Sequence, residues 1–220
     1  MRIDILTLFP DVFINFTKES IIKRAIAKEL VTINVIDFRK YSPLNNQQVD
    51  DTPYGGGSGM VLRCEPIFNA VAALREKATK VILMTPDGSL YQQKMAKQLS
   101  REKHLIIICG HYEGFDERIR SLADYEISMG DYILTGGEIP AMAVTDSIVR
   151  LIDGVINQDS LACESFENNL LDYPTYTKPQ QYKGLKVPEV LLSGDHQKIA
   201  DYRHQAQIKK TKKTRPDLLK

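Results

Sequence analysis

The reactive side chains of this 220-residue chain do not follow the spacings of the common catalytic motifs. The four histidines show no ligand spacing such as HExxH, and the three cysteines form no CxxC pair. Neither a GxSxG nucleophile elbow nor a GxxxxGKS/T phosphate loop occurs. These observations argue against a metal site, a covalent hydrolase and a P-loop nucleotidase. Carboxylates and an arginine remain as the groups that could move protons or stabilise charge.

Glycine is concentrated in the middle of the chain, where ten of the 13 glycines lie between Gly55 and Gly137. The clusters follow β-like runs, in TPDG (85–88), CGHYEGFDER (109–118) and SMGDYILTGGE (128–138). Glycine lets the backbone approach a ligand closely, and α/β sheets bind ligands beyond the carboxyl ends of their strands. Because these loops carry acids but few cations, they favour a ligand with an adenine and no phosphate. Ordinary turns are the alternative interpretation.

Two further segments have an unusual composition. VDDTPYGGGSGM (49–60) places two acids before four glycines, which is typical of a flexible loop or a plain surface linker. ESFENNLLDYPTYTKP (164–179) combines acids with aromatic residues in a stretch without periodicity. Its aromatic rings could stack on bases and its acids could abstract a proton.

Strand and helix patterns alternate along the first 150 residues, which is typical of a parallel sheet with helices on both faces. The run LIIIC (105–109) is apolar throughout, as expected for a central strand. Strands are expected at 3–9, 31–36, 81–84, 105–109 and 125–128, and helices at 20–29, 67–77, 92–100, 117–122 and 140–151.

The formal net charge of +1 conceals an uneven distribution: residues 1–177 carry −6 and residues 178–220 carry +7. The basic end, with KKTKKTR at 209–215, predicts contact with a polyanion; a solvated helix is the alternative. We therefore expect a domain at 1–157, a linker or lid at 158–176 and a small, mostly helical, basic domain at 177–220. Few cysteines and no long apolar run predict a cytoplasmic protein without a membrane partner.

Several long motifs occur in one order along the chain: LTLFP, DDTPYGGGSGM, CGHYEGFDERI, SMGDYILTGGEIPAM, LLDYPTYTKP and GLKVPEVLLSGDH. In this they resemble bacterial tRNA (guanine-N1)-methyltransferases, the TrmD family, over essentially the whole chain. The resemblance implies the SPOUT class: an α/β domain with a deep trefoil knot, an exception to the usual unthreaded connections, acting as a homodimer. It also implies S-adenosyl-L-methionine as methyl donor.

The donor-binding residues that the resemblance implies come from the three glycine-rich loops. Glu113 matches a position near the methionine end of the donor, where Mg²⁺ could assist. The implied set is Thr85, Pro86, Gly88, Gly110, Tyr112, Glu113, Met129, Gly130, Asp131, Tyr132, Ile133, Leu134, Gly136 and Gly137.

The implied substrate is tRNA with guanine at position 37, methylated at N1. Family members use an aspartate before Ser-Phe as base and an arginine after the GGE helix; here these positions hold Glu164 and Arg150. Glutamate adds a methylene, which changes the reach of the carboxylate by about 1.5 Å, and Asp172 is the competing acid. The implied tRNA-contacting residues are Asp50, Gly57, Gly59, Asp172, Lys209, Lys210, Lys212, Lys213 and Arg215.

Two alternatives to this function remain open at this stage. One is another SPOUT methyltransferase that acts on ribosomal RNA or on a ribose 2′-oxygen. The other is an RNA-binding module that keeps the fold without catalysis, for which the glutamate at the base position is the only support.

Overall fold

The computed structural model describes residues 1–161 and 164–219. The chain forms two compact units, Met1–Ile156 and Asn157–Lys220, which are described separately. The predicted linker (158–176) and the predicted basic domain (177–220) both lie in the second unit, and the boundary between them stays a prediction.

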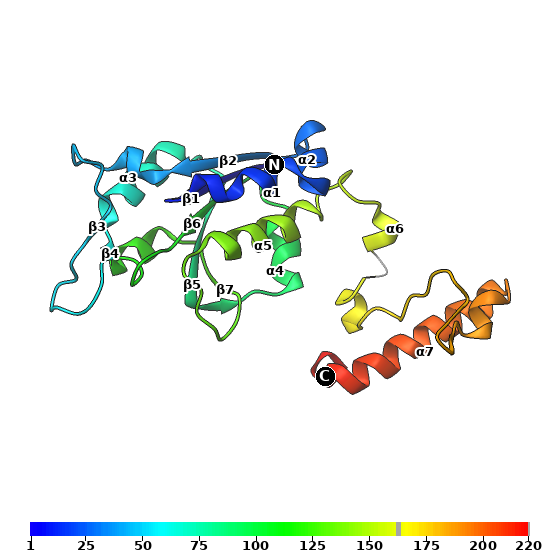
Figure 1. Cartoon of the computed structure of the whole chain (residues 1–220). Helices are drawn as coiled ribbons and strands as arrows, with labels where there is room; N and C mark the ends of the chain where they lie inside the picture. The colour runs from blue at the N-terminus through cyan, green and yellow to red at the C-terminus, as the bar shows by residue number, and fades with distance from the viewer. Residues whose placement is uncertain (162–163, 220) are drawn as a thin grey trace. The chain divides into compact units, whose positions relative to one another are not determined.

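The first unit is built on a five-stranded sheet with the order β2-β1-β6-β5-β7 (Figure 1). Every pairing in it is parallel, as the alternation of strands and helices predicted. The strands are β1 (Arg2–Thr7), β2 (Thr32–Asp37), β5 (Thr79–Leu90), β6 (His104–Cys109) and β7 (Tyr125–Ser128).

Helices cover both faces of this sheet, because alternate strand residues point to opposite sides. In β6, Leu105 and Ile107 pack in one apolar cluster, while Ile106 and Ile108 pack in the other. The first cluster includes residues of η1 (Pro10–Phe13), α2 (Ser20–Ala27), α4 (Gln93–Leu99) and α5 (Glu138–Val149), and α1 (Ile14–Lys18) adds Phe16 to it. The second includes residues of η2 (Phe38–Tyr41), α3 (Cys64–Leu74) and η3 (Glu117–Leu122).

The helix expected at 117–122 is present with the same bounds, as a 3₁₀ helix capped by the Asp116 side chain, which accepts a hydrogen bond from the backbone N–H of Arg118. One local expectation was wrong. The segment 85–88, expected as a loop, lies inside β5 at a register shift, since Met84 and Ser89 both pair with Ile127 of β7. A bulge of this kind re-aims side chains without ending the strand.

A short ribbon, unpredicted from the sequence, closes the glycine-rich loop. The two-residue strands β3 (Asp50–Asp51) and β4 (Val61–Leu62) pair antiparallel at its two ends. The loop between them is exposed, and Tyr54 near its tip is fully exposed.

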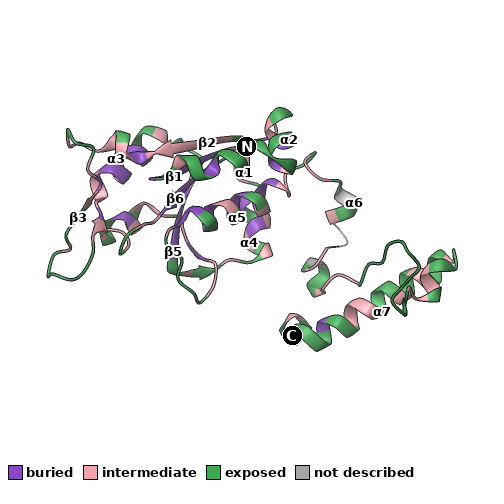
Figure 2. Ribbon diagram, in the orientation of Figure 1, coloured by how far each residue is buried: buried purple, intermediate pink, exposed green. Residues whose placement is uncertain are grey.

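The second unit centres on a 19-residue helix, α7 (His196–Thr214). Figure 2 shows this helix largely exposed, and Thr211 is the one buried residue along it. A small antiparallel hairpin, β8 (Gln181–Tyr182) with β9 (Leu185–Lys186), precedes it. The remaining elements are α6 (Gln158–Leu161), η4 (Glu167–Asn169), η5 (Glu189–Leu192) and η6 (Pro216–Leu219). No described helix is long and apolar enough to span a lipid bilayer.

Candidate active site

A cavity of about 450 Å³ opens at the carboxyl edge of the sheet in the first unit. Its walls come from the three segments that follow Met84, Cys109 and Ile127 in neighbouring strands. Twelve of the fourteen residues expected to bind the donor line it: Thr85, Pro86, Gly110, Tyr112, Glu113, Met129, Gly130, Tyr132, Ile133, Leu134, Gly136 and Gly137.

Two chain segments touch backbone to backbone at the base of this cavity. The N–H of Gly137 donates a hydrogen bond to the carbonyl of Gly110 at 2.8 Å. A Cβ at Gly137 would lie 2.7 Å from both the Cα of Cys109 and the backbone N of Gly110. Only glycine fits this contact, so Gly137 is needed for close packing of the chain rather than for a turn.

The other two expected donor residues lie outside the cavity lining. A Cβ on Gly88 would meet the backbone of Glu126 and Ile127 at 2.6 Å, so this glycine is needed for packing of the bulge against β7. Asp131 is exposed.

An arginine and an acid at the rim were missed in the sequence. The Asp87 carboxylate binds the Thr85 hydroxyl and receives a hydrogen bond from the Arg120 guanidinium at 2.6 Å. The Thr85 hydroxyl and Arg120 lower the pKa of Asp87, so the acid remains ionised. Arg120 also pairs with Glu117 at 3.0 Å and with Glu126. Glu117 and Glu126 lie close to Arg120 in the sequence, but Asp87 is 33 residues away, and no spacing rule could have identified that partner.

Among the described residues that line the cavity, His111 has a buried side-chain nitrogen, Nδ1, without a hydrogen-bond partner. The ring is held between Phe9, with centroids 4.8 Å apart, and Tyr112, at 5.1 Å. A buried ring nitrogen without a partner is available to a ligand that enters the cavity.

The glycine-rich loop lies beside this wall. Where Gly59 would carry a Cβ, the Oε1 of Glu113 lies 2.6 Å away, and the N–H of Glu113 donates to the carbonyl of Met60 at 3.0 Å. Gly57 has a φ of +136°, a conformation that favours glycine. The structure therefore brings Gly59, one of the residues expected to contact tRNA, next to the donor-loop residue Glu113, whereas Gly57 lies beside Pro53 within its own loop.

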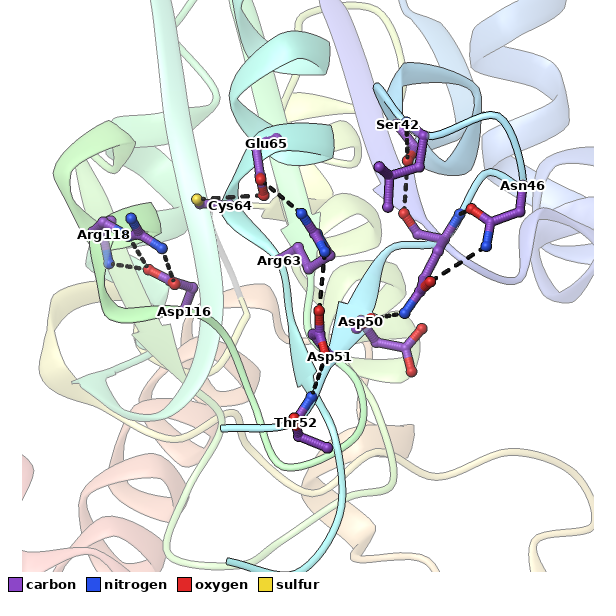
Figure 3. A network of polar contacts seen from close by, with 12 residues as sticks. Ser42, Asn46, Asp50, Asp51, Thr52, Arg63, Cys64, Glu65, Asp116 and Arg118 are labelled. Atoms are coloured by element: carbon purple, nitrogen blue, oxygen red, sulfur yellow. Dashed lines mark hydrogen bonds and ion pairs between the residues drawn. The ribbon is translucent and has the colours of Figure 1, made fainter. Parts of the chain in front are cut away.

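Ion pairs hold the β3–β4 ribbon, from which the loop extends (Figure 3). Arg63 binds Asp51 at 3.0 Å and Glu65 at 2.8 Å, and its guanidinium lowers the pKa of Glu65. The carbonyl of Asp50 accepts from the Gln48 amide at 2.8 Å, and the figure shows the Asp50 carboxylate pointing away from this network.

The expected catalytic residues belong to different units. Arg150 is the C-cap of α5 in the first unit, where its N–H donates to the carbonyl of Asp146. Glu164 and Asp172 lie in the second unit, and both are partly buried. The Oδ1 of Asp172 is buried and accepts no hydrogen bond from the described residues.

The basic cluster divides into two kinds of side chain. Lys209, Lys212 and Lys213 are exposed on α7. Lys210 donates to the carbonyl of Asp172 at 2.9 Å, and Arg215 pairs with Asp217 at 2.6 Å, so these two also have roles within the chain.

No group of three or more His, Cys, Asp or Glu side chains that could hold a metal ion occurs within residues 1–161 and 164–219. The Mg²⁺ considered near Glu113 therefore has no support from the structure.

The fold and the cavity define an α/β protein whose ligand site lies at the carboxyl edge of a parallel sheet. Residues 1–220 match the family described as tRNA (guanine-1)-methyltransferase TrmD. A tRNA (guanine-N(1)-)-methyltransferase of Malacoplasma penetrans is 56% identical over 218 residues, which cover 99% of this chain and 96% of that protein. The enzyme of Listeria innocua is 53% identical, and the match covers the whole of this chain and 92% of that protein. The enzyme of Staphylococcus epidermidis is 54% identical, and the match covers the whole of this chain and 91% of that protein. The chain belongs to the TrmD family.

Proposed function

We propose that this chain, an enzyme of the tRNA (guanine-N1)-methyltransferase family, methylates N1 of the guanine at tRNA position 37, next to the anticodon. The cavity at the carboxyl edge of the sheet is the single observation that carries the proposal, because twelve residues expected to hold the donor meet there. A tRNA substrate also favours the cytoplasm as the place of action.

The cavity fits S-adenosyl-L-methionine in size and chemistry. Its volume of about 450 Å³ lies in the range of pockets for small ligands. His111 offers an Nδ1 without a partner among the described residues, and the loops that carry Gly110 and Gly136 offer backbone groups from residues that have no side chain of their own. When bound, the donor supplies a methyl group on a sulfonium centre. Tyr112, Met129 and Leu134 would hold it by apolar contact.

Guanine N1 carries a proton at neutral pH, so the enzyme must supply a base. Glu164 is proposed to take this proton, and Arg150 to stabilise the negative charge that develops on O6. Asp172 is the second candidate for the base, favoured by its buried Oδ1, which has no partner among the described residues.

Because Arg150 and Glu164 belong to different units, we propose a homodimer in which the linker of one subunit completes the site of the other. Large apolar side chains left exposed on the first unit support an interface there: Val12, Ile14, Ile133 and Ile139 are each at least 43% exposed. The deep trefoil knot of the SPOUT class belongs to the same proposal. The glycine-only contact of Gly137 with Cys109 and Gly110 supports a tight threading at that point.

The second unit is proposed to grip the tRNA backbone. Lys209, Lys212 and Lys213 extend from the last turns of α7, where they can contact phosphates. Such contacts position an RNA without reading its sequence.

The reaction is tested by labelled methyl transfer to two unmodified tRNA transcripts that differ only at position 37. The guanine transcript is expected to be labelled at N1, and the adenine transcript is expected to remain unlabelled. Equal labelling of both would overturn the proposed site of methylation, and label on a ribose would overturn the proposed chemistry.

The base is tested by Glu164→Gln and Asp172→Asn, measured in parallel. Glu164→Gln is expected to lower turnover at least a hundredfold, the usual scale for a lost general base, while donor affinity is retained. Near-normal turnover of Glu164→Gln with an inactive Asp172→Asn would assign the base to Asp172 instead.

A further inference from the structure

Residues 165–172 form a closed loop that begins directly after Glu164 and ends at Asp172, the two candidate bases. The N–H of Asp172 donates to the Ser165 hydroxyl at 3.0 Å, and the N–H of Phe166 donates to the carbonyl of Leu170 at 2.7 Å. Ser165 follows Glu164 directly, so the bond that closes the loop links the neighbourhoods of both carboxylates. Contacts that hold this loop in place therefore also hold the backbone that carries the Glu164 and Asp172 side chains.

The helix α7 holds the loop through a threonine. Thr211 is fully buried, and its hydroxyl accepts a hydrogen bond from the N–H of Leu171 at 2.9 Å. The same hydroxyl donates to the carbonyl of Gln207 at 2.8 Å within the helix. A hydroxyl that both accepts and donates is held in one orientation, which makes it a rigid anchor for the backbone of the loop.

Two cations complete the attachment: Lys210, directly before Thr211 in α7, and Arg215, directly after the end of the helix. The Nζ of Lys210 donates to the carbonyl of Asp172 at 2.9 Å. The guanidinium of Arg215 lies 5.9 Å from the ring centroid of Phe166 and is itself held by Asp217. The loop is thus contacted near its start, at Phe166, and at its end, at Leu171 and Asp172.

We propose that Thr211 and Lys210 are positioning residues for methyl transfer. They hold the 165–172 loop so that the carboxylate next to it, on Glu164, or at its end, on Asp172, meets the guanine N1 proton. This proposal rests on the proposed function, in which Glu164 or Asp172 supplies the base. A general base acts within about 2.6–3.2 Å of its partner atom, and a misplacement of about 1 Å costs on the order of a hundredfold in rate. The turns of α7 that carry the lysines proposed to contact tRNA phosphates would then also position the catalytic carboxylate.

The first test uses two threonines of α7 that differ in one contact. The hydroxyls of Thr211 and Thr214 each donate to the carbonyl four residues earlier in the helix. The Thr211 hydroxyl also accepts a hydrogen bond from the loop, at the N–H of Leu171. At saturating tRNA and donor, Thr211→Val is expected to lower the single-turnover rate at least tenfold with tRNA affinity within twofold of wild type. Thr214→Val is expected to behave as wild type. Thr211→Ser keeps the hydroxyl, so its single-turnover rate is expected to stay within threefold of the wild-type rate.

Hydrogen exchange at the Leu171 amide provides a structural readout of the same contact. Protection of this amide is expected to fall in Thr211→Val and to stay unchanged in Thr214→Val. Urea unfolding of each variant shows whether the second unit remains folded.

A second variant keeps the proposal testable if Thr211→Val unfolds the unit. Lys210→Gln removes an exposed side chain, and Lys186→Gln in β9 removes one charge from the same unit as the control. Lys210→Gln is expected to slow single-turnover methylation about threefold at saturating tRNA, while Lys186→Gln leaves the rate unchanged.

A normal single-turnover rate in both Thr211→Val and Lys210→Gln would overturn the proposal, as would a defect that saturating tRNA removes. Loss of Leu171 protection without loss of rate would give Thr211 a purely structural role. Failure of the proposed function looks different: the wild-type enzyme would not label guanine 37, or Glu164→Gln and Asp172→Asn would both remain active.

Discussion

At the amino edge of the sheet, Asp4, Thr79 and His104 are buried and every polar atom of their side chains has a partner. At the carboxyl edge, the buried Nδ1 of His111 has none among the described residues, and the chain segments meet through glycines. The two edges belong to the same five strands and share the same apolar layers. The comparison shows that this protein keeps a closed polar network at one end of its sheet and leaves open acceptors and space at the other.

The amino-edge network is centred on the carboxylate of Asp4. It accepts from the guanidinium of Arg2 at 2.6 Å and from the amide of Asn34 at 2.7 Å, and it contacts the Nε2 of His104 at 3.0 Å. The other ring nitrogen of His104 contacts the Thr79 hydroxyl at 2.7 Å. Such complete pairing stabilises the fold and leaves no group to bind a ligand.

The largest expected effect comes from breaking this network with Asp4→Ala. Removal of the carboxylate leaves the buried His104 and the half-buried Asn34 without their acceptor, so we expect a loss of about 3–5 kcal/mol in the free energy of unfolding, measured by urea denaturation. Lys80→Gln, which breaks an exposed pair with Asp124 at the start of β5, is the control and is expected to cost less than about 1 kcal/mol. Equal costs for the two variants would contradict the comparison.

A smaller effect is expected at the carboxyl edge from Gly137→Ala. The added Cβ would press on the backbone of Cys109 and Gly110, and overpacking of this kind costs about 2 kcal/mol. We expect donor affinity, measured by calorimetry, to fall about thirtyfold. Gly184→Ala, which has a φ of +82° but open space, is the control and should leave donor binding unchanged. Unchanged donor affinity in Gly137→Ala would remove the glycine contact from the site.

The smallest effect is expected from Asp87→Asn at the rim. Its exposed pair with Arg120 contributes less than about 1 kcal/mol, so donor affinity should change by less than about fivefold. Because the pKa of Asp87 is lowered, its carboxylate is charged above that pKa and loses its contribution only as the pH falls through it. The difference between wild type and variant should therefore stay constant from pH 8 to 5, and a change within that range would contradict this assignment.

The amino-acid pattern predicted the sheet well because a strand that is buried on both faces has a continuous run of apolar residues. The run of apolar residues in β6 and the alternation of helices required only local information. The glycine clusters likewise marked the cavity, since close approach of the backbone excludes other residues at positions such as Gly137.

Features that depend on contacts distant in sequence could not be predicted. The strands β3 and β4 have only two residues each, too few for a periodic pattern. The bulge at 85–88 arises from pairing with β7, and the interaction of Arg120 with Asp87 from folding of the chain. In KKTKKT, nothing distinguishes Thr211 from Thr214, although only the first is buried. The roles of Glu164, Arg150 and the basic cluster stay predictions that the proposed assays test.

The contact at Gly137 has a consequence for the redox chemistry of the enzyme. Cys109 lies under this contact, and burial raises the pKa of its thiol well above the ordinary value, with Glu138 contributing. A protonated, covered thiol resists alkylation and oxidation, whereas Cys64 is partly exposed. Alkylation of Cys109 therefore requires the segment at Gly137 to separate from the segment at Cys109 and Gly110. The alkylation rate would then report the frequency of this local opening.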